Sequence, residues 1–308
     1  MISALKQTLR RVALNTGLAG LAARGAKGVR MLMHHGVSGA FGPERLEEQI
    51  IWIKARCPIL PFGEVATRLR DERPLPDLAV VLTFDDGLRN NVTQAYPVLL
   101  KHQVPATFFV CPGLIDTGGW VWTYEVRERL KGLAKEELQS LAGKPLETVD
   151  QVVSWMKKQP NAQRVQMLEA IRSATPGFQV TETMRRDYDL ASWEELAKLD
   201  RRLITLGSHT MSHPILSSLP PDELESDLKT SKEALVAKGL SAADETFFCY
   251  PDGNHNDAVV ACAAKHYAAA CSTRKGFITA ASPLMAMPRI GATGSLEDVA
   301  WRMWRPGA

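Results

Sequence analysis

Two short motifs carry the side chains in this sequence that are best suited to catalysis. The first is T-F-D-D-G at residues 83–87, and the second is H-T-M-S-H at residues 209–213. Together they supply two carboxylates and two imidazoles, which are the ligand types of a catalytic divalent-metal site with one carboxylate left over. If the two motifs meet in space, these residues predict a metal-dependent hydrolase.

Each motif also has a simpler interpretation. His209 and His213 can present both imidazoles to one ion if the chain turns helically between them, but this spacing is also common without metal. Asp85 and Asp86 stand before Gly87, and these residue types form ordinary turns. Against a plain turn, adjacent carboxylates on different sides of the backbone can divide the work, one binding metal and the other taking protons.

The elements that must position these motifs are apolar runs without polar alternation. That character is typical of strands buried on both faces of a parallel sheet. We expect strands over residues 29–34, 79–84, 106–111, 203–207, 245–250, 267–271 and 284–290. Polar candidates follow the runs or lie at their ends, namely His34, His35, Asp85, Asp86, His209, Tyr250, Asp252 and Arg289. Parallel barrels build their active sites on the face of the strand carboxyl ends, so the coincidence predicts one site.

Helix-like segments alternate with these runs, which predicts either a barrel or a doubly wound sheet. The expected helices cover residues 43–54, 91–101, 193–199, 221–237 and 257–265. The alternation breaks between Val110 and Leu203, where no convincing strand is found. A connection of that length is uncommon unless it carries structure of its own. We therefore expect a helical insertion over about residues 120–190, with helices near 124–142 and 149–174.

Size and composition limit the classes of protein to consider. The chain has 308 residues, of which 45% are apolar and 23% charged, as in ordinary globular proteins. A net charge of only +3 argues against nucleic-acid binding, for which a strongly basic surface is expected. The five cysteines are odd in number and form no C-x-x-C pair, which favours core thiols in a reducing compartment over a disulfide framework.

The first 29 residues form a separate basic segment without any acidic residue. Apolar residues recur in it at helical spacing, which predicts a basic amphipathic helix over residues 1–29. Such a helix either contacts an anionic membrane surface or packs on the domain. Because Asn15 and Thr16 interrupt the apolar run, a secretory signal is the less favoured interpretation. We expect a cytoplasmic protein, with peripheral membrane contact through residues 1–30 left open.

The two motifs resemble those of a known family. T-F-D-D-G followed by H-T-x-S-H is similar to the first two motifs of the polysaccharide deacetylases, the NodB-homology family or carbohydrate esterase family four. Further agreement lies in residues 31–37, 104–110, 192–196 and 248–253, in the family's order. The match runs from about residue 30 to 292, apart from the insertion. It implies a distorted (β/α) barrel of about seven parallel strands, with residues 30–308 as a single deacetylase domain.

The resemblance implies a role for each motif residue. Asp86, His209 and His213 would bind a divalent metal, and Asp85 would be the general base. Zinc is the expected metal, and cobalt or nickel also suits one carboxylate with two imidazoles. A backbone N–H near Tyr250, together with the metal, would stabilise the oxyanion.

One part of the family pattern is missing. The usual donor of a proton to the leaving amine is a histidine in a late L-x-x-H segment, and residues 278–289 contain no histidine. We take His35 as the candidate acid, with His34 as the alternative, because alternation along a strand lets only one of them point inward. Arg289 either orients Asp85 and keeps it ionised or is a surface arginine.

Candidate substrate contacts are weaker. Asp252 either contacts sugar hydroxyls or caps a turn, and Trp120 and Trp122 are candidate stacking platforms for sugar rings. The preferred function is removal of N-acetyl groups from amino sugars of a polysaccharide or lipid-linked glycan, so that an N-acetylated glycan is the expected partner. The alternatives are an O-acetyl esterase of a polysaccharide and a catalytically silent glycan-binding protein.

Overall fold

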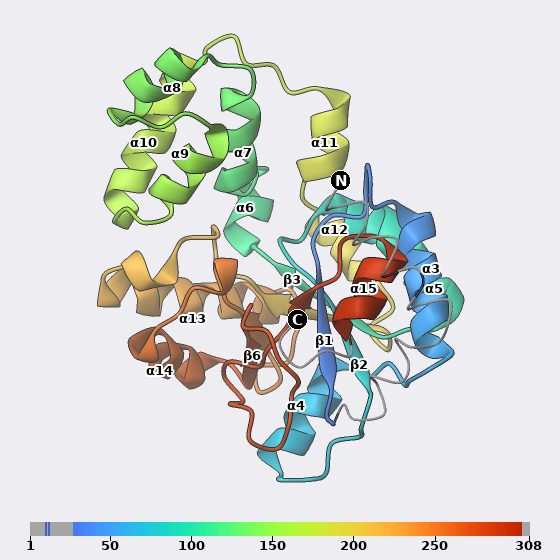
Figure 1. Ribbon diagram of the computed structural model, residues 1–308. Helices are drawn as coiled ribbons and strands as arrows, with labels where there is room; N and C mark the ends of the chain where they lie inside the picture. The colour runs from blue at the N-terminus through green and yellow to red at the C-terminus, as the bar shows by residue number, and fades with distance from the viewer. Residues whose placement is uncertain (1–9, 11, 13–26, 304–308) are drawn as a thin grey trace.

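The computed structural model describes residue 10, residue 12 and residues 27–303 (Figure 1). The predicted helix over residues 1–29, together with the membrane contact left open for it, lies almost wholly outside the described residues. Among the helices within them, none is both long enough and apolar enough to cross a bilayer. All five cysteines are buried free thiols.

Seven parallel strands form the centre of the fold, in the order β6-β5-β4-β3-β2-β1-β7. They are β1 (Arg30–His34), β2 (Val80–Phe84), β3 (Ala106–Val110), β4 (Ile204–Ser208), β5 (Phe247–Cys249), β6 (Ala269–Cys271) and β7 (Ile290–Gly291). Every registered pair of neighbours is parallel. The predicted barrel of about seven parallel strands with a helical insertion is confirmed. The first six strands begin and end within two residues of their expected limits.

The last predicted strand, 284–290, is wrong in extent. Its first part bonds to the β6 edge, where Met287 donates its N–H to the Ala270 carbonyl. Only Ile290 and the residue after it form regular strand, and they pair with β1 at the other edge of the sheet. The chain changes partner at Pro288, which has no N–H to continue a ladder. This segment therefore joins the two edges and closes the barrel around Arg289.

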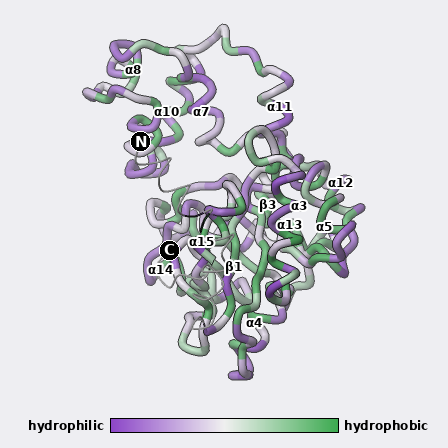
Figure 2. The backbone as a smooth tube through the Cα atoms, turned by 45° about the vertical axis from the view of Figure 1, so that its right-hand side comes forward, coloured by the Kyte–Doolittle hydropathy of each residue, from purple (hydrophilic) through white to green (hydrophobic). Residues whose placement is uncertain are grey.

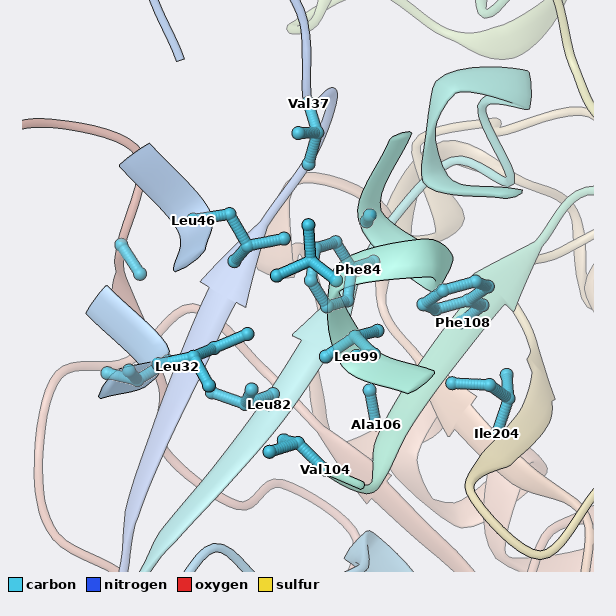
Figure 3. Packing of buried hydrophobic residues seen from close by; sticks show 14 of the residues in the cluster. Leu32, Val37, Leu46, Leu82, Phe84, Leu99, Val104, Ala106, Phe108 and Ile204 are labelled. Atoms are coloured by element: carbon cyan, nitrogen blue, oxygen red, sulfur yellow. The ribbon is translucent and has the colours of Figure 1, made fainter. Parts of the chain in front are cut away.

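Alternating residues of the strands separate two apolar layers. In β2, Val80, Leu82 and Phe84 belong to the cluster between the sheet and the outer helices, which Figure 3 shows around Leu99 and Phe108. Val81 faces the interior of the barrel, whose base is filled by Phe62. The centroid of the Phe62 ring lies 5.9 Å from that of Phe109 and 4.8 Å from that of Phe247. The alternation directs Thr83, and then Asp85, to the inner side.

Helices cover the outside of the sheet. The outer helices are α3 (Pro43–Lys54), α5 (Tyr96–His102), α13 (Pro221–Ala237), α14 (Asp257–His266) and α15 (Leu296–Met303), and α4 (Phe62–Arg70) lies at the base. Three of them match the predicted helices over 43–54, 221–237 and 257–265. Figure 2 shows the hydrophobic strands surrounded by helices of mixed hydropathy, as expected of helices with one apolar side.

The predicted insertion separates β3 from β4. Its helices are α6 (Pro112–Thr117), α7 (Trp122–Leu130), α8 (Lys135–Ala142), α9 (Val149–Met156), α10 (Asn161–Ala174), α11 (Glu182–Tyr188) and α12 (Trp193–Ala197). Helices α7 to α10 pack around an apolar core of their own that includes Val126, Val152 and Ile171. In Figure 1 they form a layer above the carboxyl ends of the strands, on the side where the site residues lie.

Candidate active site

The two sequence motifs meet at the carboxyl ends of β2 and β4. Asp85 and Asp86 directly follow β2, and His209 directly follows β4. The Asp86 backbone has φ +73° and the His213 backbone has φ +57°, so both lie in the left-handed region that non-glycine residues rarely adopt. Asp86 and His213 thus have turn conformations in the loops that follow β2 and β4, where the three candidate ligands come together.

Asp86, His209 and His213 form a compact buried cluster. Asp86 Oδ1 lies 3.5 Å from His209 Nε2 and 3.5 Å from His213 Nε2. Although this oxygen is buried, it has no hydrogen-bond partner in the described part of the chain. Burial alone would raise the pKa of Asp86, but the neighbouring His209, His35 and His213 hold that pKa far below its usual range. An ionised carboxylate with an unpartnered oxygen facing two imidazoles fits a divalent-metal site.

The two histidines are held differently. His209 Nδ1 hydrogen-bonds the Cys249 carbonyl oxygen at 2.6 Å, which makes Nδ1 the donor and leaves Nε2 free to ligate. His213 is held through its backbone, because its N–H donates to Thr210 Oγ1 at 3.0 Å and its carbonyl oxygen accepts from Trp122 Nε1 at 3.1 Å. The buried Nδ1 of His213 has no partner among the residues that the structure describes. Burial lowers the pKa of His213 to about 4, so the ring is neutral, as a ligand must be.

Asp85 forms a buried ion pair with Arg289. Arg289 Nη1 donates to Asp85 Oδ1 at 2.7 Å, and Nη2 donates to Oδ2 at 2.8 Å. The same guanidinium also donates to Thr83 Oγ1 and to the Ser272 carbonyl, each at 3.0 Å. Burial alone would raise the pKa of Asp85, but the charge of Arg289 and its hydrogen bonds outweigh burial and lower it. Arg289 is 1% exposed, so the interpretation as a surface arginine is wrong.

The structure separates the two neighbouring histidines after β1. His34 faces the outer layer, where its ring stacks on Phe84 at 4.7 Å and on Phe41 at 5.7 Å. Burial lowers the pKa of His34 to about 4, so this side chain is a neutral packing residue. His35 is half-buried, and it is among the neighbours that lower the pKa values of Asp85 and Asp86. The alternation of the strand therefore turns His35, rather than His34, toward the site.

The predicted substrate contacts of the loop after β5 are not free side chains. Tyr250 is fully buried and donates its hydroxyl to the Met285 carbonyl oxygen at 2.8 Å. Its backbone N–H donates to the Cys271 carbonyl oxygen at 3.3 Å, so the predicted oxyanion donor already has a partner. Asp252 is exposed, but it forms an ion pair with Lys157 at the end of α9. The loop thus joins the barrel to the insertion.

The two tryptophans of the insertion have different positions. Trp122 is 6% exposed and donates to the backbone of His213, so its prediction as a sugar-stacking platform is wrong. Trp120 is half-buried, donates to Asp189 Oδ1 at 2.8 Å and lies 5.4 Å from the Tyr188 ring.

A further site residue was missed in the sequence. Tyr124 of α7 donates its hydroxyl to Asp86 Oδ2 at 2.5 Å. Its phenol is buried against the carboxylates, which raises its pKa well above the usual value and keeps the hydroxyl protonated. Tyr124 belongs to no motif of the family resemblance, and a tyrosine in an amphipathic helix is ordinarily a packing residue. Only the position of α7 above the site reveals this contact.

Comparison with known proteins agrees with this geometry. A family model described as polysaccharide deacetylase matches residues 72–270. The chain belongs to the polysaccharide deacetylase family. Over 73 residues it is 34% identical to the poly-beta-1,6-N-acetyl-D-glucosamine N-deacetylase of Escherichia coli (strain K12), an alignment that covers 23% of this chain and 11% of that protein. The similarity to that relative therefore spans about a tenth of its length.

Solved structures of other deacetylases share the fold. The deacetylase PplD of Streptococcus pyogenes, solved in complex with acetate, is 19% identical with a TM-score of 0.61, over 90% of this chain and 99% of that one. IcaB from Ammonifex degensii is 18% identical with a TM-score of 0.59, over 90% and 97% of the two chains.

Proposed function

We propose that this member of the family is a metal-dependent hydrolase that removes N-acetyl groups from amino sugars of a polysaccharide or lipid-linked glycan. The observation that carries the proposal is the unpartnered, buried Asp86 Oδ1 facing two histidine Nε2 atoms, next to a second carboxylate that is kept ionised. The name of the E. coli relative supports poly-β-1,6-linked N-acetylglucosamine as the first substrate to test.

Asp86, His209 and His213 hold the divalent ion in this proposal. Zinc suits the set best, and cobalt or nickel also suits one carboxylate and two imidazoles. When bound, the ion lowers the pKa of water at the site and polarises the acetyl carbonyl. His209 Nδ1 donates a hydrogen bond to the Cys249 carbonyl oxygen. This bond keeps the imidazole ring in the tautomer that leaves Nε2 free to ligate.

The other site residues move protons. Asp85, ionised by Arg289, accepts a proton from the water that attacks the amide carbon. His35 donates a proton to the amine as the carbon–nitrogen bond breaks, so that amide and water become acetate and a free amine. General acid–base catalysis of this kind typically increases the rate by about 10²–10⁴-fold.

Replacing His35 tests the assignment of the acid. We expect His35→Asn to lower kcat for N-acetylated sugars by about 10²–10⁴-fold. An aryl acetate such as p-nitrophenyl acetate needs no protonation of its leaving group, so its hydrolysis should be nearly unchanged. The measurement is the ratio of the two rates in the variant and in the wild type.

His34→Asn is the matched control for this test. The His34 ring packs between Phe41 and Phe84 and does not face the site, so its loss should lower the melting temperature and leave the ratio of rates unchanged. An equal loss on both substrates in His35→Asn would contradict the role of His35 as the acid.

The function itself is tested by substrate comparison. The metal-loaded protein should release acetate from β-1,6-linked N-acetylglucosamine oligomers faster than from O-acetylated oligosaccharides. The reverse order would favour the O-acetyl esterase. Binding of both without release of acetate would favour the silent glycan-binding protein.

A further inference from the structure

Helix α7 of the insertion contacts two of the three proposed metal ligands. Tyr124 donates its hydroxyl to Asp86 Oδ2, and Trp122 donates its indole N–H to the carbonyl oxygen of His213. The two donors lie two residues apart at the start of the same helix. The insertion is therefore in direct contact with the centre of the site.

These two ligands are the ones with unfavourable backbone conformations. Asp86 and His213 both have positive φ, whereas His209 follows β4 with ordinary backbone. A non-glycine residue stays in the left-handed region only where its surroundings hold it there. The two hydrogen bonds from α7 reach these two residues, one at the side-chain carboxylate of Asp86 and one at the backbone carbonyl of His213.

The hydrogen bonds also direct the ligand atoms. With Tyr124 on Asp86 Oδ2, the other oxygen of that carboxylate faces the two imidazoles. A metal-binding histidine usually has its second ring nitrogen fixed by a hydrogen bond. His213 lacks this bond among the described residues, so the orientation of its ring depends on its backbone, which Trp122 holds from one side.

Helix α7 is itself firmly held. The Tyr124 ring stacks on Tyr188 at 4.9 Å with an interplanar angle of 22°, and Val126 is completely buried in the core of the insertion. Glu125 accepts hydrogen bonds from Arg129 on the same helix and from Arg172 on α10. The two donors are therefore presented by a rigid element.

We propose that α7 is a positioning element of the metal centre, in which Tyr124 fixes the Asp86 carboxylate and Trp122 fixes the backbone of His213. Neither residue is placed in contact with the reacting atoms, so each acts through a ligand. The inference rests on the metal binding that forms part of the proposed function. It gives the insertion a role in metal affinity beyond covering the site.

The test compares metal affinity in single variants. Zinc affinity is measured by competition with a chromogenic chelator, and the visible absorption spectrum of the cobalt-loaded protein reports on ligand geometry. We expect Tyr124→Phe and Trp122→Phe each to bind zinc about 10–100-fold more weakly and to change the cobalt spectrum.

The chain offers close controls. Tyr188→Phe removes a hydroxyl that donates to Glu128 at 3.0 Å in the same stacked pair, and Trp120→Phe removes an indole that donates to Asp189. Both should keep wild-type affinity and the wild-type spectrum. Melting of the metal-free proteins identifies any variant that has lost its fold, and the other variant then carries the test.

Two failures have different meanings. If wild-type protein binds no divalent metal, the proposed function is wrong. If wild type binds metal and Tyr124→Phe and Trp122→Phe match Tyr188→Phe and Trp120→Phe in affinity and spectrum, only the role of α7 is overturned.

Discussion

Asp85→Asn should lower kcat for deacetylation by about 10²–10⁴-fold while leaving metal affinity unchanged. Asn keeps the shape of the side chain and one acceptor oxygen for Arg289, but its amide nitrogen is a donor, and it cannot accept the proton of the attacking water. The proposed base and the proposed ligand are separate groups: both Asp85 oxygens accept hydrogen bonds from Arg289, whereas Asp86 Oδ1 lies 3.5 Å from both imidazoles. Single-turnover kinetics and metal titration on the same sample measure the two quantities.

The neighbouring carboxylate provides the matched comparison. Asp86→Asn removes a proposed ligand, so both metal binding and activity should be lost. If Asp85→Asn loses activity alone and Asp86→Asn loses both activity and metal binding, the base and the ligand are distinguished. If Asp85→Asn retained more than a tenth of the wild-type rate, another group would have to act as the base.

Arg289→Met should destabilise the protein by about 3–5 kcal/mol at neutral pH, because it leaves the Asp85 carboxylate buried without its partner. In the wild type the pKa of Asp85 is lowered, so the pair stabilises the fold above the unfolded pKa of the carboxylate. This stabilisation is lost as the pH falls through the lowered pKa of the folded state. Chemical denaturation over a pH series measures the effect.

In Arg289→Met the pKa of Asp85 should shift in the opposite direction, upward. Without Arg289, burial is unopposed and raises the pKa of Asp85, so protonation relieves the destabilisation as the pH falls. The acidic limb of the rate profile should move to higher pH for the same reason. Arg289→Lys keeps the charge but loses the paired hydrogen bonds and should lie between the two. Equal destabilisation at every pH would indicate that Arg289 acts through packing alone.

The sequence predicted the cluster of Asp86, His209 and His213 because Asp86 and His209 come at the end of continuous apolar runs. Such runs are buried strands, and the carboxyl ends of parallel strands share one face. Asp85, Asp86 and His209 could therefore be placed together before any contact was known. Alternation within β1 likewise allowed only one of His34 and His35 to face the site, although the pattern alone did not decide which.

Contacts between distant segments could not be predicted in the same way. Arg289 reaches Asp85 across 204 positions of sequence, and it lies where the last segment changes its partner strand. The pattern of apolar residues predicts a strand in that segment, but it does not indicate which edge of the sheet each part pairs with. Trp122 and Tyr124 were harder still, because the choice between a packing aromatic and a hydrogen-bond donor depends on how the whole insertion docks on the barrel.

The most direct test of metal-dependent deacetylation is acetate release from N-acetylglucosamine oligomers by protein stripped of metal with a chelator. The stripped protein should be inactive, and one equivalent of zinc or cobalt per chain should restore release. Restoration should fail in Asp86→Asn, which lacks a proposed ligand. Undiminished release by protein shown to be free of metal would contradict a metal-dependent mechanism.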